Sequence, residues 1–310
     1  MVHTENERKE ELSYYYEKNY ERHVHSAAEI IKVFHLHGTI PAFGIVLGSG
    51  LGDVADAIED AHRVPYEDIP YFPRTTVEGH EGTLIVGKLE GVPVIGLKGR
   101  KHYYEVADQL YNNGILQTVF PVHVLAELGV PNYFVTNAAG GLNQSYSVGD
   151  AMIIRSHINL LPNSLLGRQK KFLRLDGTPV WRFQPMNDAY DPHLREMLLN
   201  QNRFGPHVHE GVYLAVTGPT FETEAESIAF RNGLFADAVG MSTAPEVIVA
   251  RNRGMKAVGF SCITNKIAAD GTNATNHEEV KAILDSEDVR KRLESLVCGF
   301  FAEYRKESGL

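Results

Sequence analysis

Residues 99–105, Gly-Arg-Lys-His-Tyr-Tyr-Glu, bring together side chains that could bind an oxyanion. If this segment is extended, Arg100, His102 and Tyr104 share one face, because side chains alternate along extended backbone. An arginine offers a planar fork of N–H donors to an oxyanion, and a histidine can donate a further hydrogen bond. Glu105 could orient that histidine. An exposed, charged strand end would explain any one of these residues alone, but their clustering favours an anion site.

A glycine-rich turn at residues 48–52, Gly-Ser-Gly-Leu-Gly, follows a short apolar run at 43–47. Such a turn can present backbone N–H groups and the hydroxyl of Ser49 to a phosphate. It is not the dinucleotide-binding fingerprint, because its third glycine comes one residue early, and no Gly-Lys-Ser/Thr follows to make a P-loop. From the turn alone, a phosphate site and a tight turn without a ligand remain open alternatives.

Other predicted strand ends carry side chains suited to a flat heterocycle. Phe221 could stack on such a ring while Glu222 accepts from its N–H groups, although the same stretch is typical of a helix N-terminus. The amide of Asn265 could pair with the edge of a base, although a lone asparagine there is more often a turn former. Met241 could pack on a sugar or base face, or belong to the core.

Two other kinds of chemistry find little support. The His-x-His pairs at 23–25, 35–37 and 207–209 have no further ligands at recognisable zinc spacing, and no His-Glu-x-x-His occurs. No Gly-x-Ser-x-Gly elbow is present, so a serine hydrolase is not indicated. We therefore expect neither a metal nor a serine nucleophile.

Composition limits the possible partners. The 310 residues include 30 Lys and Arg against 39 Asp and Glu, which gives a formal net charge of -9. This balance argues against a broad nucleic-acid or anionic-membrane surface, but it leaves room for a local anion site. The polar N-terminus, the absence of a long apolar run and the presence of only two cysteines predict a cytoplasmic protein without a membrane segment.

These side chains must be positioned by alternating strands and helices. The hydrophobic pattern predicts strands at 43–47, 84–89, 92–97, 132–136, 151–155, 212–216, 238–239 and 257–263. It predicts helices at about 108–128 and 222–233, with an amphipathic helix at the C-terminus. Residues 62–80 are expected to form a loop-rich connection, and Thr275 with Glu278 to form a capping box.

Together these elements predict a single-domain α/β fold with a mixed, largely buried sheet flanked by helices. The domain is expected to span residues 37–310, after a polar lead-in and helix at 1–36.

Three long strings identify a resemblance. They are Val-Thr-Asn-Ala-Ala-Gly-Gly-Leu at 135–142, Ala-Val-Gly-Met-Ser-Thr at 238–243 and Asn-His-Glu-Glu-Val at 276–280. With the other motifs, they resemble the trimeric, low-molecular-mass purine nucleoside phosphorylase family over roughly residues 40–300. The resemblance implies a homotrimer with active sites near subunit interfaces, acting in purine salvage. The implied reaction joins a purine (2′-deoxy)ribonucleoside and inorganic phosphate, as co-substrate without a cofactor, to give free base and (deoxy)ribose 1-phosphate.

The resemblance also implies roles for individual residues. The phosphate pocket would comprise Ser49, His80, Arg100, His102, Ala138 and Ser242. The nucleoside site would comprise Tyr104, Phe183, Tyr213, Phe221, Glu222, Met241, Asn265 and His277, with Phe183 donated by a neighbouring subunit. Among all of these, the implied catalytic residues are His102, Glu222, Asn265 and His277.

Hydrogen-bond complementarity then predicts the base. An asparagine amide can donate to N7 and meet O6, and a glutamate can accept from N1–H, so Asn265 and Glu222 favour inosine and guanosine over adenosine. The alternative is a methylthioadenosine phosphorylase, which would have an aspartate in place of Asn265. A nicotinamide dehydrogenase built on the turn at 48–52 and a non-catalytic purine-binding protein are further alternatives. The glycine spacing argues against the first, and the phosphate-pocket residues argue against the second.

Overall fold

Short apolar runs form a nine-stranded mixed sheet in the part of the chain that the structure describes. The computed structural model describes residues 5–48, 51–76, 82–166, 171–201 and 207–310. The strands are β1 (Phe43–Leu47), β2 (Glu59–Pro65), β3 (Thr83–Leu89), β4 (Val92–Lys98), β5 (Asn132–Gly141), β6 (Ala151–Asn159), β7 (Val208–Ala215), β8 (Ala238–Gly240) and β9 (Lys256–Lys266).

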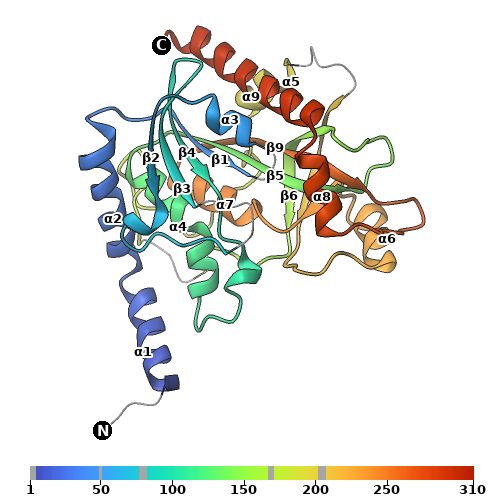
Figure 1. Cartoon of the computed structure of the whole chain (residues 1–310). Coiled ribbons are helices and arrows are strands. Elements are labelled where there is room, and N and C mark those ends of the chain that lie inside the picture. Colours follow the sequence, from blue (N-terminus) through green and yellow to red (C-terminus); the bar gives the residue numbers. More distant parts are fainter. Residues whose placement is uncertain (1–4, 49–50, 77–81, 167–170, 202–206) are drawn as a thin grey trace.

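The sheet closes partly on itself. Its strand order is β2-β3-β4-β1-β5-β8-β7-β6-β9, and β9 also pairs in parallel with β5. Strands β5, β8, β7, β6 and β9 therefore form a closed ring, which leaves β2 at the free edge (Figure 1). In this ring β5 and β9 are long strands that pair in parallel. Their C-terminal ends therefore lie side by side.

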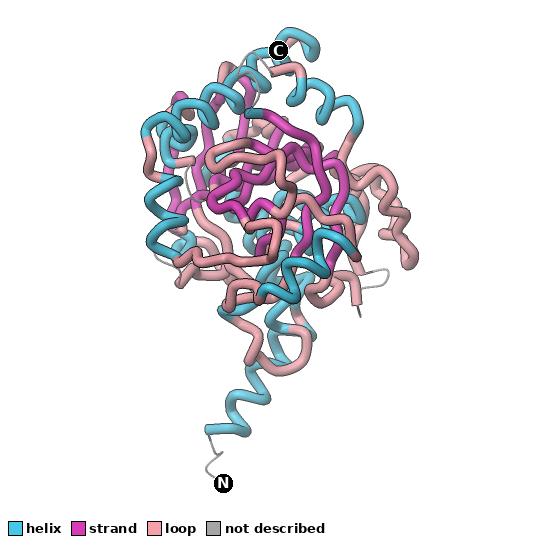
Figure 2. Tube along the Cα trace, turned by 90° about the vertical axis from the view of Figure 1, so that its right-hand side faces the viewer, coloured by secondary structure: helices cyan, strands magenta, loops and turns pink. Residues whose placement is uncertain are grey.

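Helices cover both faces of the sheet (Figures 1 and 2). The helices are α1 (Glu5–Lys18), α2 (Tyr20–Ile31), α3 (Gly52–Asp56), α4 (Asn113–Glu127), α5 (Pro192–Leu199), α6 (Glu224–Asn232), α7 (Ala244–Arg253), α8 (His277–Leu284) and α9 (Glu287–Ser308), with short helical turns η1 (Lys32–Leu36), η2 (Tyr66–Asp68) and η3 (Tyr103–Glu105). Helices α2, α4 and α7 pack against one face and α3, α5 and α9 against the other.

The strands supply both cores by alternation. On β5, Tyr133 and Val135 join the cluster of α2, α4 and α7, whereas Phe134 between them joins the opposite cluster. This period of two is what a sheet buried on both faces requires. The predicted single-domain α/β fold with a mixed, largely buried sheet is confirmed. Among the described residues, no helix is long and apolar enough to cross a membrane.

Three local predictions need correction. Residues 59–65, mostly within the expected loop, form the edge strand β2, whose side chains are almost all exposed and therefore carry no apolar pattern. The cap of α8 is not Thr275 but Asn276, whose side chain accepts from the N–H of Glu279 at 2.9 Å. The helix expected from about 108 begins only at Asn113, because residues 106–112 form irregular turns.

Candidate active site

Strand ends and the loops that follow them surround a cavity of about 420 Å3. Its walls come from the ends of β5, β8 and β9, the segment after β4, the approach to α6, and α8. Ten of the residues expected in the site line this cavity: Arg100, His102, Tyr104, Ala138, Phe221, Glu222, Met241, Ser242, Asn265 and His277. The fold thus gathers at one place residues that lie up to 177 positions apart in the sequence.

Two of the expected residues do not line this cavity, and two others lie outside the described residues. Tyr213, expected to line the cavity, is fully buried in β7 behind it, where its hydroxyl accepts from the N–H of Ser242 at 3.2 Å. The Phe183 side chain does not line the cavity and is 83% exposed. Ser49 and His80 lie outside the described residues, although the neighbouring Gly48 does line the cavity.

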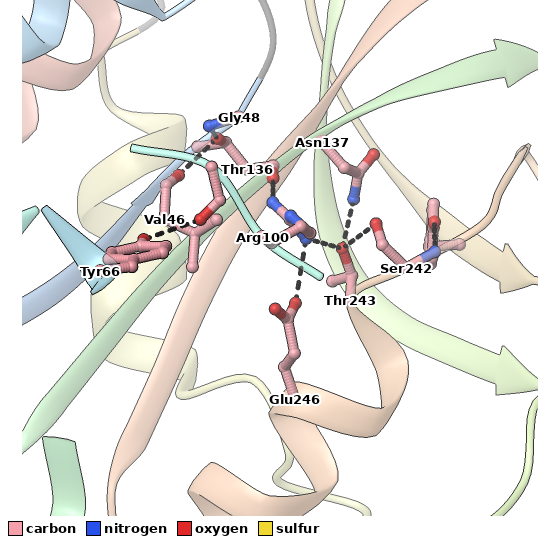
Figure 3. Close-up of polar contacts among 11 residues, drawn as sticks. Val46, Gly48, Tyr66, Arg100, Thr136, Asn137, Ser242, Thr243 and Glu246 are labelled. Atoms are coloured by element: carbon pink, nitrogen blue, oxygen red, sulfur yellow. Dashed lines mark hydrogen bonds and ion pairs between the residues drawn. The ribbon is translucent and has the colours of Figure 1, made fainter. Parts of the chain in front are cut away.

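A buried ion pair holds Arg100 at the cavity (Figure 3). Its Nη1 donates to Oε2 of Glu246 at 2.9 Å, and the two side chains are only 5% and 4% exposed. The same Nη1 donates to Thr243 at 3.2 Å, and Nη2 donates to the carbonyl of Thr136. A buried charge needs such partners, because an unpaired one would be strongly destabilising. Glu246 in the first turn of α7 was not predicted, since its partner is far away in the sequence.

The hydroxyl of Thr243 organises three neighbours at once. Besides Arg100, Asn137 donates to its Oγ1 at 2.9 Å, and Ser242 Oγ lies 3.1 Å away. A hydroxyl has two acceptor lone pairs and one hydrogen. Because Arg100 and Asn137 occupy both lone pairs, Thr243 donates its own hydrogen to Ser242. The hydrogen of Ser242 is then left to donate toward a ligand in the cavity.

The backbone of Thr243 itself is strained. Its φ of 68° lies in the left-handed region, which is costly for a β-branched residue, by about 1–3 kcal/mol. The sequence does not reveal this conformation, because no glycine or asparagine marks the position. The hydrogen bonds of its side chain and the helix that begins at Ala244 offset the strain.

Glu105 fixes the ring of His102. Its carboxylate accepts from the backbone N–H of His102 at 2.6 Å and from Nδ1 at 3.1 Å. Lys101 and Thr76 donate to its other oxygen. The predicted orienting role of Glu105 therefore has a geometric basis, although residues 103–105 form η3 and not an extended segment. The contact through Nδ1 therefore fixes which edge of the His102 ring faces Glu105.

The charge states of this pair follow from their surroundings. Burial lowers the pKa of His102, despite the opposing effect of the hydrogen bond that its Nδ1 donates to Glu105. Burial alone would raise the pKa of Glu105, but the hydrogen bonds from His102, Thr76 and Lys101 outweigh it and hold that pKa well below its usual range. At neutral pH the pair is thus an anionic carboxylate and a neutral imidazole whose Nε2 can accept a proton. The ring is also stacked on Tyr104, with centroids 5.0 Å apart.

The opposite end of the cavity suits a planar, polar ring. The Oδ1 atom of Asn265 accepts from Thr264 at 3.3 Å, and its Nδ2 donates to Asn273 at 3.2 Å, so the amide is oriented. Glu222 lies on the same cavity, and burial raises the pKa of its carboxyl. Thr264 and Asn273 were not predicted, because neither stands out without knowledge of what it contacts.

The first two turns of α8 form the remaining wall. His277 opens the helix, and Val280, Lys281, Leu284 and Asp285 line the cavity below it. These four residues were not predicted; their helical spacing from His277 is the signal that could have found them. Among the described residues, no group of three or more His, Cys, Asp or Glu is placed to hold a metal ion. The cavity thus pairs donors for an anion with an amide and a carboxylate for a heterocycle.

Comparisons with known proteins agree with this geometry. A family described as the Phosphorylase superfamily matches residues 42–302. Purine nucleoside phosphorylase 1 of Geobacillus stearothermophilus is 46% identical over 259 residues, which cover 83% of this chain and 89% of that protein. Purine nucleoside phosphorylase of Rattus norvegicus is 43% identical over 249 residues, 77% of this chain and 82% of that one.

Solved structures show the same likeness. A Schistosoma purine nucleoside phosphorylase in complex with hypoxanthine has a TM-score of 0.79 and 36% identity, covering 91% of this chain and 97% of that chain. The Schistosoma mansoni purine nucleoside phosphorylase in complex with inosine has a TM-score of 0.75 and 37% identity, covering 88% of this chain and 94% of that chain.

Proposed function

We propose that this chain, which belongs to the phosphorylase superfamily and within it to the purine nucleoside phosphorylases, cleaves the N-glycosidic bond of 6-oxopurine nucleosides reversibly with inorganic phosphate. It is a pentosyltransferase, and its products are the free base and (deoxy)ribose 1-phosphate, as in purine salvage. One observation carries the proposal. A single cavity joins the anion donors Arg100 and Ser242 to the base-recognition pair Glu222 and Asn265.

At the phosphate end, the side chains can bind and prepare the nucleophile. Arg100 and the hydroxyl hydrogen of Ser242 would hold phosphate oxygens, with the backbone at Ala138. Neutral His102 can take a proton from a protonated phosphate at Nε2, because Glu105 holds its Nδ1 side. Ser49 and His80 are proposed for the same pocket on the sequence resemblance alone.

Bond cleavage then needs no protein nucleophile. A phosphate oxygen forms a bond to C1′ while the C1′–N9 bond breaks, and the electron pair leaves with the purine. Positive charge develops on the sugar, next to the phosphate anion, which stabilises it. Tyr104, Met241 and His277 would contact the ribose, with His277 near the 5′-hydroxyl. Inorganic phosphate is thus a co-substrate, and we propose no cofactor.

At the base end, hydrogen bonding sets the preference. The purine gains negative charge as it leaves, and Asn265 can donate to N7 while Glu222 accepts from N1–H. Phe221 supplies an aromatic surface beside the ring. A 6-aminopurine reverses this donor and acceptor pattern, so inosine and guanosine are the proposed substrates. A methylthioadenosine phosphorylase, the alternative, would need a carboxyl at position 265.

Phe183 supports a trimeric assembly. Its ring is 83% exposed and does not line the cavity of its own subunit. Exposure of a large aromatic on an excursion that also exposes Trp181 is unfavourable for an isolated chain and typical of an interface. We propose a cytoplasmic homotrimer in which Phe183 reaches the active site of a neighbouring subunit.

A substrate panel tests the proposed function. With phosphate, the protein should cleave inosine and guanosine and release ribose 1-phosphate, while adenosine and methylthioadenosine should react far more slowly. Without phosphate, no base should be released, since phosphate is the nucleophile. Equal release of hypoxanthine in phosphate-free buffer would rule out phosphorolysis, and faster cleavage of methylthioadenosine would favour the alternative.

The raised pKa of Glu222 predicts an acid limb in the pH profile of inosine cleavage. The ionised carboxylate is a much stronger acceptor for N1–H than the protonated carboxyl, so kcat/KM should fall as pH drops through this raised pKa. Glu222→Gln should lower kcat/KM at neutral pH by about ten- to hundredfold and abolish this limb, because an amide does not titrate. If the limb persists unchanged in Glu222→Gln, another group causes it and the assignment of Glu222 is wrong.

Phe183→Ala tests the contribution of the neighbouring subunit. The variant should raise the KM for inosine by about tenfold, because an aromatic contact to the nucleoside is lost, and leave the KM for phosphate unchanged. Trp181→Ala, on the same exposed segment, is the control for a general effect on the loop. An unchanged inosine KM in Phe183→Ala, or a monomeric mass by light scattering, contradicts the proposed assembly.

A further inference from the structure

Helix α1 lies outside the part of the chain that matches the family. The match begins at residue 42, whereas α1 spans residues 5–18 and projects from the body in both views (Figures 1 and 2). Residues 9–17 of this helix nevertheless contact the chain at residues 108–113. This segment leads from η3, which carries Glu105, to the start of α4. Helix α1, which projects from the body, therefore contacts the segment that directly follows the wall of the proposed phosphate pocket.

Glu17 makes the central contact. Its carboxylate accepts from the backbone N–H of Asn112 at 3.1 Å and from the Asn112 side chain at 3.2 Å. Asn112 is the N-cap of α4, but its own side chain makes no capping hydrogen bond. Helix N-termini have unsatisfied N–H groups and a positive dipole end, so an anionic carboxylate there is favourable. Glu17 thus caps α4 from another helix.

Three more contacts hold the same segment. Asn113, only 2% exposed, donates from its side chain to the carbonyl of Ser13 at 2.9 Å. The hydroxyl of Tyr111 donates to Glu10 at 3.3 Å, and its ring meets Tyr14 edge-on with centroids 6.2 Å apart. Tyr111 has a φ of 56°, a left-handed conformation that a tyrosine adopts at a cost. These contacts with α1 help to hold the segment in that conformation.

The start of α4, which directly follows this segment, is packed tightly against residues 103–106. A Cβ added to Gly114 would lie 2.5 Å from the carbonyl oxygen of Val106 and 3.3 Å from the ring of Tyr103. The N–H of Val106 in turn donates to the carbonyl of Tyr103 at 3.0 Å. Glu105, between them, fixes the ring of His102. A continuous path of contacts therefore runs from Glu17 through Asn112 and Gly114 to the imidazole.

We propose that α1 is a positioning element for the phosphate side of the active site, with Glu17 as its main positioning residue. The inference rests on the proposed function, because it assigns phosphate to the pocket beside His102. It concerns that side because Glu10, Ser13 and Glu17 of α1 contact residues 111–113, which connect η3 to α4. Loss of Glu17 should therefore weaken phosphate binding more than nucleoside binding.

The test uses Glu17→Ala in the full-length protein, with Glu29→Ala as the matched control. Glu29 is an exposed glutamate of α2 whose ion-pair partner is Lys32. Inorganic phosphate is titrated calorimetrically without nucleoside, and the KM values for phosphate and inosine are measured separately. Glu17→Ala should raise the phosphate Kd and KM about three- to tenfold and leave the inosine KM unchanged. Glu17→Gln, which keeps an acceptor for Asn112, should restore most of the loss.

Each other outcome overturns the inference. Phosphate affinity equal to that of Glu29→Ala would mean that α1 has no influence on the pocket. An equal rise in both KM values, or a fall in thermal stability alone, would mean that α1 only supports the fold. If Glu17→Ala fails to fold, Tyr111→Phe, which removes only the hydrogen bond to Glu10, should give a smaller rise in the phosphate Kd and KM with the inosine KM unchanged. The proposed function fails if the wild-type protein cleaves no nucleoside. The phosphate titration can still be carried out in that case, so this failure is distinguished from failure of the inference about α1.

Discussion

The ion pair between Arg100 and Glu246 is the interaction on which the rest of the site depends. It joins the segment after β4 to the first turn of α7, two elements 146 residues apart. Removing one partner from such a buried pair costs about 3–5 kcal/mol, because the other charge is left without compensation. The pair therefore restricts how α7 can lie against the sheet. That placement in turn sets Thr243, through which Asn137 and Ser242 are positioned.

This arrangement explains how a chain with a net charge of -9 can attract an anion. The overall charge acts over long distances, where salt screens it, whereas the cavity acts through a few donors held out of water. Arg100 brings the positive charge, and the donor hydrogen of Ser242 is aimed by Thr243. His102 adds a neutral ring that can accept a proton. An acidic surface and a local anion site are compatible because the surface charge acts over long distances and the donors of the site act at hydrogen-bonding distance.

The sequence was informative where chemistry depends on local pattern. Apolar runs predicted the buried strands, and the polar and aromatic side chains at strand ends predicted part of the cavity wall. The sequence did not predict the role of a residue that acts through a partner far away in the chain. Nothing local indicates that Glu246 will meet Arg100, that Glu17 will cap α4, or that Thr243 will take a positive φ. Edge strand β2 was missed for a related reason, because its pairing uses backbone groups and its side chains face water.

The wall of the site also shows the limit of motif-based reasoning. A string of matching residues shows which segments lie near the cavity. It does not show whether a given side chain faces the cavity or packs behind the residues that line it. Tyr213 is the example: it stands next to the cavity in the fold, yet it supports Ser242 from behind. Phe183 is the opposite case, since its ring is exposed and would reach a cavity only in the proposed assembly.

If the Arg100–Glu246 pair creates the phosphate site, phosphate titration of Arg100→Gln/Glu246→Gln tests its role most directly. The double substitution leaves no unpaired buried charge, so the fold should persist, as thermal unfolding can verify. The account predicts that calorimetric affinity for phosphate falls by about a hundredfold or more in this folded variant. A folded double variant that binds phosphate as tightly as the wild type would contradict it.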